Sequence, residues 1–425
     1  MARSHGAPWY YCYVPHGMAG GATSAMIPLF AYALGAGLLE VGIVAAATSV
    51  ASVPAFILWG ILSDRLGRRK VFLVIGFLGG AASFAVMALS TTLLEFVAAN
   101  LLLGFLGAAG GPVGAVLVME TSERKLWATR LAALSRVGGI GWTAGLSLGV
   151  GWLASGAGPL GDLTAMRGLF VLAAILSVAS AGLVMIWLRE PATKVDRRAV
   201  GVVDDHHRIE RGKFLPMRML HFFDPRNHVR RSSRFPRPLK VYLASVLLLF
   251  VGFTGFYGFF PIFLKEAFLL ADPDIFAVYI ASHVTSVLVY PRTGRWVDAR
   301  GSRPMQVYAS LGRAALFPSF LALAAVPLPH AARLGVALAL HAGVGLCWAV
   351  LNVAGTTLVS RLASEDGHAQ SMGAYSAIQG IGAIVGPLLT GVVAQVFGYP
   401  AAFALTVASI LAGIAILAID RVPER

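Results

Sequence analysis

Long apolar runs make up most of this 425-residue chain, and each is close in length to a helix that crosses a lipid bilayer. A crossing helix needs about 20 mostly apolar residues. Charged residues account for only 13% of the chain, against roughly 25% in soluble domains, which is too few to coat a soluble fold of this size. The sequence therefore predicts an all-α membrane protein and argues against a soluble enzyme, a nucleic-acid-binding domain and a disordered chain.

Twelve transmembrane helices can be placed on these runs. Their expected ranges are 9–33, 40–62, 70–90, 93–119, 132–154, 168–188, 240–264, 274–297, 305–326, 332–359, 371–396 and 400–419. Most connections are short, so neighbouring helices run antiparallel. The expected domains are a six-helix bundle at 1–190, a basic linker at 191–238 with an interfacial helix, and a second six-helix bundle at 239–425.

The basic residues lie on one side of this predicted topology. With the N-terminus in the cytoplasm, 30 of the 34 Lys and Arg residues fall in cytoplasmic loops, the linker or the adjoining helix ends. This is the bias expected of a multi-pass membrane protein, and it accounts for the net charge of +14 without a nucleic-acid partner. We therefore expect a plasma-membrane protein with both termini in the cytoplasm. The stretch 189–240 is expected to lie on anionic lipid headgroups.

No cofactor, metal or disulfide is expected. Cys12 and Cys347 both lie within apolar runs and should be buried thiols. The histidines of the linker fit no standard metal-binding spacing. No removable signal peptide precedes the first apolar run.

The two halves of the chain repeat the same motifs. The pattern G-x-x-x-D-x-x-G-x-R begins at Gly60 after the second span and again at Gly294 after the eighth. Three further matches keep nearly the same spacing, and they are 27–30 with 260–263, 100–104 with 341–345, and 135–145 with 376–386. Four matches in one order indicate two homologous halves in parallel orientation. Such halves predict a solute site near the midplane, exposed to each side in turn by a rocking motion.

With the stretch GILSDRLGRRK at 60–70, the repeat resembles the major facilitator superfamily of secondary transporters over all twelve spans. The resemblance implies that spans 1, 4, 7 and 10 line a central cavity, with spans 2, 5, 8 and 11 beside it. It also implies that the loop acids lock the halves together in one state. This chain has Asn100 where the span-4 motif carries Arg, and Gly141–Gly145 lacks the Pro of the antiporter motif. Both departures count against proton antiport.

Two aspartates form the centre of the expected gates. Asp64 and Asp298 lie at the inner ends of spans 2 and 8, near the positive N-terminal ends of spans 11 and 5. The alternative is that these loops only supply positive charge for topology. Glu120 and Arg124 are spaced to pair on one helix, as a latch or as a plain surface pair. The expected gating residues are Gly60, Asp64, Arg65, Gly67, Arg68, Glu120, Arg124, Gly294, Asp298, Gly301 and Arg303.

Strongly polar side chains inside the spans are few, and each is costly in lipid, so each is a functional candidate. The candidates for substrate binding or coupling are His16, Asn100, Arg136, Tyr257, His283, His341 and Gln379. Their structural alternatives are satisfied core positions and snorkelling. Arg313 lies on span 9, which is peripheral in the resembling family, and is expected to be structural or to snorkel. The aromatic run at 253–260 suits either helix packing or the apolar part of a substrate.

No Asp or Glu lies near the middle of a span, so no carboxylate proton relay is expected. The cavity should be neutral to positive. This favours a secondary transporter of a small organic anion or polar metabolite. We expect it to be a monomer that uses a coupling proton or ion, and histidine is the residue type that would carry the proton. The alternatives are efflux of lipophilic compounds by proton antiport and a transport-dead sensor on the same scaffold. No enzyme motif is present.

Overall fold

The computed structural model describes residues 8–122, 127–160, 162–190, 235–363 and 368–419. Within these ranges the chain is almost entirely helical and contains no strand. Most of the predicted linker at 191–238 lies outside the described residues, and with it the expected interfacial helix. The predicted all-α fold is confirmed.

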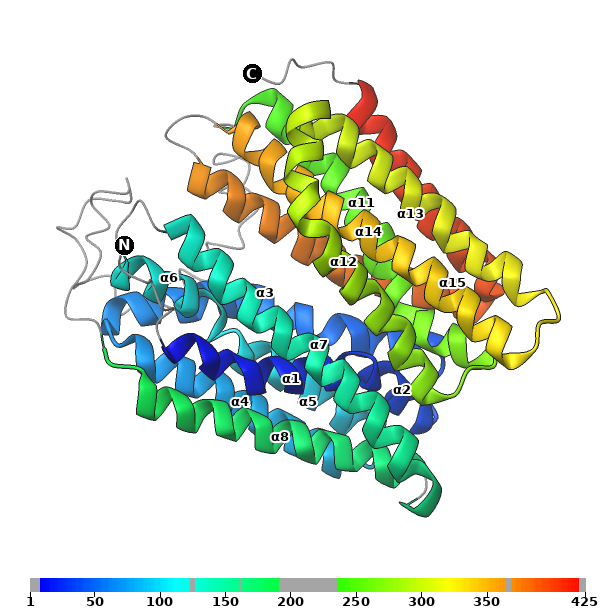
Figure 1. The fold of residues 1–425 in the computed structure, drawn as a ribbon, viewed down its shortest axis with the longest axis horizontal. Coiled ribbons are helices and arrows are strands. Elements are labelled where there is room, and N and C mark those ends of the chain that lie inside the picture. The colour runs from blue at the N-terminus through cyan, green and yellow to red at the C-terminus, as the bar shows by residue number, and fades with distance from the viewer. Residues whose placement is uncertain (1–7, 123–126, 161, 191–234, 364–367, 420–425) are drawn as a thin grey trace.

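The two halves of the chain form two helical bundles (Figure 1). The N-terminal half contains the 3-10 helix η1 (Pro8–Cys12) and the α-helices α1 (Tyr13–Ser24), α2 (Met26–Ala33), α3 (Leu38–Leu66), α4 (Arg69–Leu89), α5 (Leu93–Gly107), α6 (Gly111–Thr121), α7 (Trp127–Leu160) and α8 (Asp162–Trp187). The C-terminal half contains α11 (Arg237–Glu266), α12 (Asp272–Arg300), α13 (Ser302–Ala324), α14 (His330–Leu362) and α15 (His368–Ile419).

Nine stretches of the described helices are long and apolar enough to cross a membrane, and α5 is a shorter apolar helix. One of the nine lies in α15, where a break at Gly398 separates the last two predicted spans. Predicted spans 1 and 4 are each divided into two helices, the first into α1 and α2 and the fourth into α5 and α6. Each split lies just before a proline, Pro28 or Pro112, whose nitrogen has no hydrogen to donate to the preceding turn.

Glycines bring helices into close contact at equivalent places in the two halves. In the N-terminal half α1 packs on α7, and a Cβ at Gly145 would overlap the carbonyl of Met18. In the C-terminal half α11 packs on α15, and a Cβ at Gly386 would lie 2.5 Å from the carbonyl oxygen of Val251. Gly145 and Gly386 are matched positions of the sequence repeat, so the repeat is also a repeat of helix packing.

The start of α1, the end of α8, the start of α11 and the end of α15 lie at one end of the molecule, which we call the terminal end (Figure 1). The opposite end is the distal end.

The two halves meet from the distal end to about mid-height. Helices α3 and α15 run antiparallel there, and the backbone N–H of Leu38 donates to Gln395 Oε1 at 2.8 Å. One turn further along, Gly391 would bring a Cβ within 3.3 Å of Gly42 Cα. Near mid-height, Val53 still lies beside Gly380.

Toward the terminal end the halves separate. Gly60 on α3 and Gly373 on α15 continue the same antiparallel pairing, yet a Cβ on either would meet no atom within 4 Å. Helices α7 and α12 also separate toward the terminal end. The ring centres of Trp142 on α7 and His283 on α12 are 6.3 Å apart, whereas Val287, one turn of α12 nearer the terminal end, is 58% exposed. Among the described residues, the two bundles thus contact each other at the distal end and lie apart at the terminal end (Figure 1).

Candidate functional site

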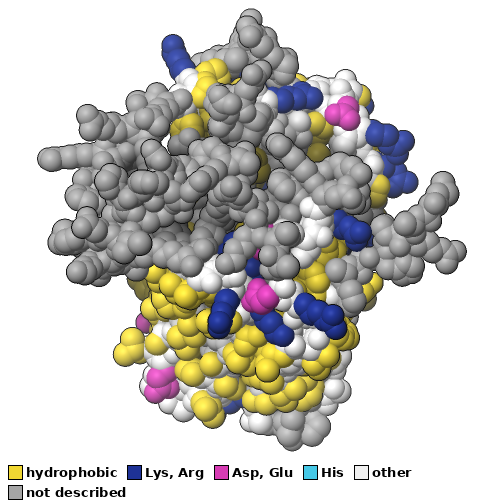
Figure 2. Space-filling model, turned by 90° about the vertical axis from the view of Figure 1, so that its left-hand side faces the viewer, with side chains coloured by type: hydrophobic (Ala, Val, Ile, Leu, Met, Phe, Trp, Pro, Cys, Tyr) yellow, Lys and Arg dark blue, Asp and Glu magenta, His cyan; other side chains and the backbone are white. Residues whose placement is uncertain are grey.

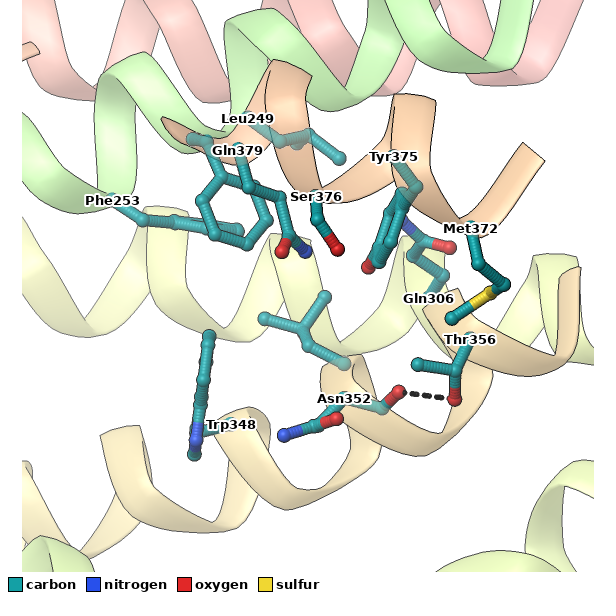
Figure 3. Close-up of a pocket in the computed structure, with 12 residues that line it drawn as sticks. Leu249, Phe253, Gln306, Trp348, Asn352, Thr356, Met372, Tyr375, Ser376 and Gln379 are labelled. Carbon is teal, nitrogen blue, oxygen red and sulfur yellow. Dashed lines mark hydrogen bonds between the residues drawn. The ribbon is translucent and has the colours of Figure 1, made fainter. Parts of the chain in front are cut away.

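A cavity of about 170 Å³ lies inside the C-terminal half, between mid-height and the terminal end (Figure 3). Four helices, α11, α13, α14 and α15, supply its walls. The lining residues are Leu249, Phe250, Phe253, Gln306, Trp348, Leu351, Asn352, Thr356, Met372, Tyr375, Ser376 and Gln379. Aromatic and amide side chains therefore share the cavity, and none of the described residues that line it is a carboxylate.

Some amide groups of this cavity are held by hydrogen bonds to tyrosines, whereas other polar groups point into the cavity. Gln306 is held, because its Oε1 accepts a 2.9 Å hydrogen bond from the Tyr242 hydroxyl. Asn352 Nδ2 donates to the Tyr290 hydroxyl at 3.2 Å. The polar ends of Gln379 and Ser376 point into the cavity toward α14 (Figure 3). The arrangement offers both hydrogen-bond donors and acceptors to a bound molecule.

Phe253 and Trp348 stand at one end of the cavity and also hold a buried arginine. The Arg313 guanidinium carbon lies 4.6 Å from the Phe253 ring centre and 5.1 Å from the Trp348 ring centre. Both separations are typical of cation–π contacts. Arg313 is only 2% exposed, so the expectation that it snorkels to the membrane interface is wrong. It lies inside the half because α13 turns this face toward α11 and α14.

Tyr257 and His341 meet above this arginine, toward the distal end. The hydroxyl of Tyr257 lies 3.2 Å from His341 Nε2, and His341 Nδ1 lies 2.8 Å from the carbonyl oxygen of Val278. A carbonyl can only accept, so Nδ1 carries the hydrogen and a neutral ring accepts at Nε2 from the tyrosine. His341 is therefore a satisfied, buried histidine of the same interior as the cavity.

The remaining predicted site residues are dispersed. His283 faces Trp142 at the contact of the two halves, while Arg136 is exposed on the terminal part of α7. His16 lies inside the N-terminal half, where its backbone N–H donates to Ser180 Oγ at 2.8 Å.

Asn100 is fully buried in the same half. Its Nδ2 donates to the Phe96 carbonyl, and its Oδ1 has no hydrogen-bond partner among the described residues. Of the seven predicted residues, Gln379 alone lines the cavity, and Tyr257 and His341 lie beside it.

The aromatic run at 253–260 divides between two roles. The Phe256 ring stacks on Phe317 with centres 3.7 Å apart, and Phe259 packs edge-on against Phe403 at 5.1 Å. These rings are buried core. Phe253, in contrast, lines the cavity.

The repeated loop motif has a clear backbone role. Gly67 and Gly301 end α3 and α12 with φ of 61° and 87°, a region that disfavours side chains with a Cβ. The Asp298 carboxylate is exposed at the terminal end. Arg303 donates from its Nε to the Leu417 carbonyl at 2.7 Å.

Several predicted gating groups cannot be placed in this way. The side chains of Asp64 and Arg65, and all of Arg124, lie outside the described part of the chain. Arg68 is exposed, and Gly60 and Gly294 face open space.

Glu120 pairs with Arg69, a contact that the sequence spacing did not predict. Arg69 donates to both of its carboxylate oxygens, with the shortest separation at 2.9 Å from Nη2. The two side chains are 2% and 9% exposed, and Arg69 Nη1 also donates to Ser63 Oγ at 2.7 Å. This buried bidentate pair joins α4 to α6. The expected pair of Glu120 with Arg124, as a latch or a surface pair, stays a prediction, because Arg124 lies outside the described residues.

A second polar cluster, missed at the sequence level, closes the distal end. Glu266 Oε1 accepts from the Tyr32 hydroxyl and Oε2 from the Tyr399 hydroxyl, each at 2.5 Å. Tyr32 belongs to the N-terminal half, whereas Glu266 and Tyr399 belong to the C-terminal half. The position of Glu266 at a helix end was visible in the sequence, but its partners come from distant helices.

Basic side chains gather on the terminal end of both bundles (Figure 2). The exposed ones include Arg68, Arg189, Arg237, Lys240, Arg300 and Arg361. At the distal end, two basic side chains have partners within the protein. Lys265 forms an ion pair with Asp272 at 2.7 Å, and Arg167 donates a hydrogen bond to the Ser90 carbonyl at 3.0 Å.

The fold is that of a multi-pass integral membrane protein made of two related bundles. The sequence model of the Major Facilitator Superfamily matches residues 10–370 and 275–425, and the chain belongs to this family. The resemblance drawn from the loop motif is therefore confirmed. The family consists of transporters, which supports the transport and membrane assignments made from sequence.

Known proteins show how far this likeness reaches. A tetracycline resistance protein of class D from Salmonella ordonez is 33% identical over 159 residues, which is 37% of this chain and 37% of that protein. A mutant of the nucleoside transporter NupG has a TM-score of 0.74 at 15% identity, with 97% and 98% of the chains covered. The D-xylose-proton symporter has a TM-score of 0.70 at 15% identity, with 98% of this chain and 98% of that chain covered. The human organic anion transporter MFSD10 has a TM-score of 0.63 at 18% identity, with 96% of this chain and 98% of that chain covered. At these identities the solved structures share the fold alone.

Proposed function

We propose that this protein is a secondary transporter that moves a small solute by alternating access. The observation that carries the proposal is the asymmetric contact of the halves. They are in contact from Leu38 and Gln395 to mid-height, and they diverge at Gly60 and Gly373. This is one of the two states that a rocking mechanism requires.

The orientation follows from charge. Exposed Lys and Arg residues gather at the terminal end, which the positive-inside rule places in the cytoplasm of a plasma-membrane protein. The described state is then open to the cytoplasm. Asp298 is exposed in it, as expected of a gate acid released from its helix end.

The proposed cargo is a small organic anion or polar metabolite. The lining of amide, hydroxyl and aromatic groups suits a polar solute with an apolar part, and the described lining holds no carboxylate that would favour a cation. Efflux of a lipophilic compound is the second candidate, since one relative at 33% identity confers tetracycline resistance. A sensor role is less favoured because the open terminal end has the geometry of a transport state.

Paired cysteines test alternating access without knowledge of the cargo. Leu38→Cys with Gln395→Cys should crosslink in the described state, and Gly60→Cys with Gly373→Cys only when the terminal end closes. Native Cys12 and Cys347 are buried and should not compete. We expect both pairs to crosslink in membranes, and each crosslink to suppress the other.

Single-cysteine variants and reversal by reducing agent serve as controls. A protein in which the Gly60–Gly373 pair never crosslinks, while the Leu38–Gln395 pair does, would have one rigid state. That result would reject the transporter in favour of the sensor.

A further inference from the structure

One face of α13 carries two buried polar groups that lack partners. Gln306 lines the cavity, and the next positions on the same face of the helix are Ser310 and Arg313. Ser310 Oγ and Arg313 Nε are both buried without a hydrogen-bond partner among the described residues. Buried polar groups are nearly always satisfied, so two neighbours without partners point to a missing ligand.

The charge of Arg313 is also uncompensated. No salt bridge or hydrogen bond joins its guanidinium to any described residue, and it is 2% exposed. The titratable groups near it are Tyr257, Cys347, Tyr290 and His341, none of which is a carboxylate. A buried arginine without a counterion is costly, and a bound anion would remove most of that cost.

The two rings beside Arg313 connect it to the cavity. Phe253 and Trp348 contact the guanidinium and line the cavity at the same time. Its positive charge therefore lies directly behind the aromatic wall, where water is largely excluded and electrostatic attraction is strong. The lining residues at this end are aromatic and apolar, whereas the amides of Asn352 and Gln379 lie toward the middle of the cavity (Figure 3).

We propose that Arg313, assisted by Ser310, is the anion-binding group of this cavity and that the cargo is an organic acid. The acid group lies toward α13, an aromatic or apolar body contacts Phe253 and Trp348, and further polar groups meet Asn352 and Gln379. This inference rests on the proposed transport function and names the substrate class of the same site. It requires a small displacement of the two rings to admit the acid group.

Benzoate and its uncharged amide, benzamide, are matched probes of this site. They are titrated into the full-length purified protein, and binding is followed by thermal stabilisation and by tryptophan fluorescence, for which Trp348 is a local reporter. We expect benzoate to stabilise the wild type and benzamide to bind at least tenfold more weakly. Arg313→Gln should weaken benzoate binding at least tenfold, and Ser310→Ala about threefold.

Two further variants keep the test decisive. Arg292→Gln removes an exposed arginine that contacts only the Leu288 carbonyl among described residues, and should bind benzoate as the wild type does. Arg313→Lys keeps the charge and should keep the preference for benzoate over benzamide if Arg313→Gln does not fold.

Equal binding of the two probes by the wild type, no benzoate response in the wild type, or unchanged benzoate binding in Arg313→Gln would each overturn the inference. The cysteine crosslinking uses no anion, so a failure of the transport proposal is recognised separately.

Discussion

The Tyr32 hydroxyl donates a 2.5 Å hydrogen bond to Glu266, and this bond crosses from the N-terminal to the C-terminal half. The same carboxylate accepts from Tyr399, which lies in its own half. One carboxylate thus makes two equivalent bonds, of which only one has to break when the distal end opens.

Tyr32→Phe should favour opening of the distal end, because it removes the bond between the halves. We expect a change of about 1 kcal/mol, or roughly fivefold, in the equilibrium between the two states. Tyr399→Phe is the matched control and should leave this equilibrium nearly unchanged. The yield of the Leu38→Cys–Gln395→Cys crosslink reports the population, and equal yields for the two tyrosine variants would contradict the prediction.

Gly145→Ala should destabilise the N-terminal half, because the new Cβ overlaps the Met18 carbonyl. Overpacking of this kind costs about 1–3 kcal/mol. Gly138→Ala on the same helix meets open space and should be neutral or slightly stabilising, since alanine favours the helix by about 0.5–1 kcal/mol over glycine. Thermal unfolding in detergent compares the two variants.

Glu120→Gln should be strongly destabilising, because it removes the carboxylate that pairs with the buried Arg69 guanidinium. Removing one member of a buried pair costs about 3–5 kcal/mol. Arg68→Gln, a neighbouring exposed position, should change stability by at most about 0.5 kcal/mol. If both variants unfold at the wild-type temperature, the pair does not hold α4 to α6.

Asp298→Asn should hinder closure of the terminal end without unfolding the protein. The exposed carboxylate contributes nothing to the core in the described state, so its proposed value lies in the closed state. We expect less crosslinking of Gly60→Cys with Gly373→Cys and an unchanged melting temperature. Wild-type crosslinking would leave the aspartate with a topological role only.

The bilayer explains why the fold can be predicted from the sequence. A helix in lipid must be long and apolar, and a repeat of Gly145 at Gly386 must serve the same contact in both halves. The local breaks at Pro28 and Pro112 were less visible, because prolines are tolerated in many membrane helices.

The candidate site is harder to predict from the sequence than the fold, because the partners of each side chain come from other helices. Sequence spacing suggested only Arg124 as a partner of Glu120, whereas the partner that the structure describes, Arg69, comes from α4. Trp348 and Asn352 continue the helical stripe of His341 on α14 and could have been selected by that spacing. For Arg313, the resemblance to the family predicted a place on a peripheral helix. Only the packing of α13 shows that its side chain faces the interior of the half.

The separation of α3 and α15 at Gly60 and Gly373 has a consequence for vesicle experiments. By the proposed mechanism, a solute on the terminal side reaches the cavity without a change of state, whereas a solute on the distal side binds only after the protein opens on that side. Membrane vesicles of opposite sidedness should therefore bind the same solute with very different kinetics, immediately in one case and at the rate of a conformational change in the other.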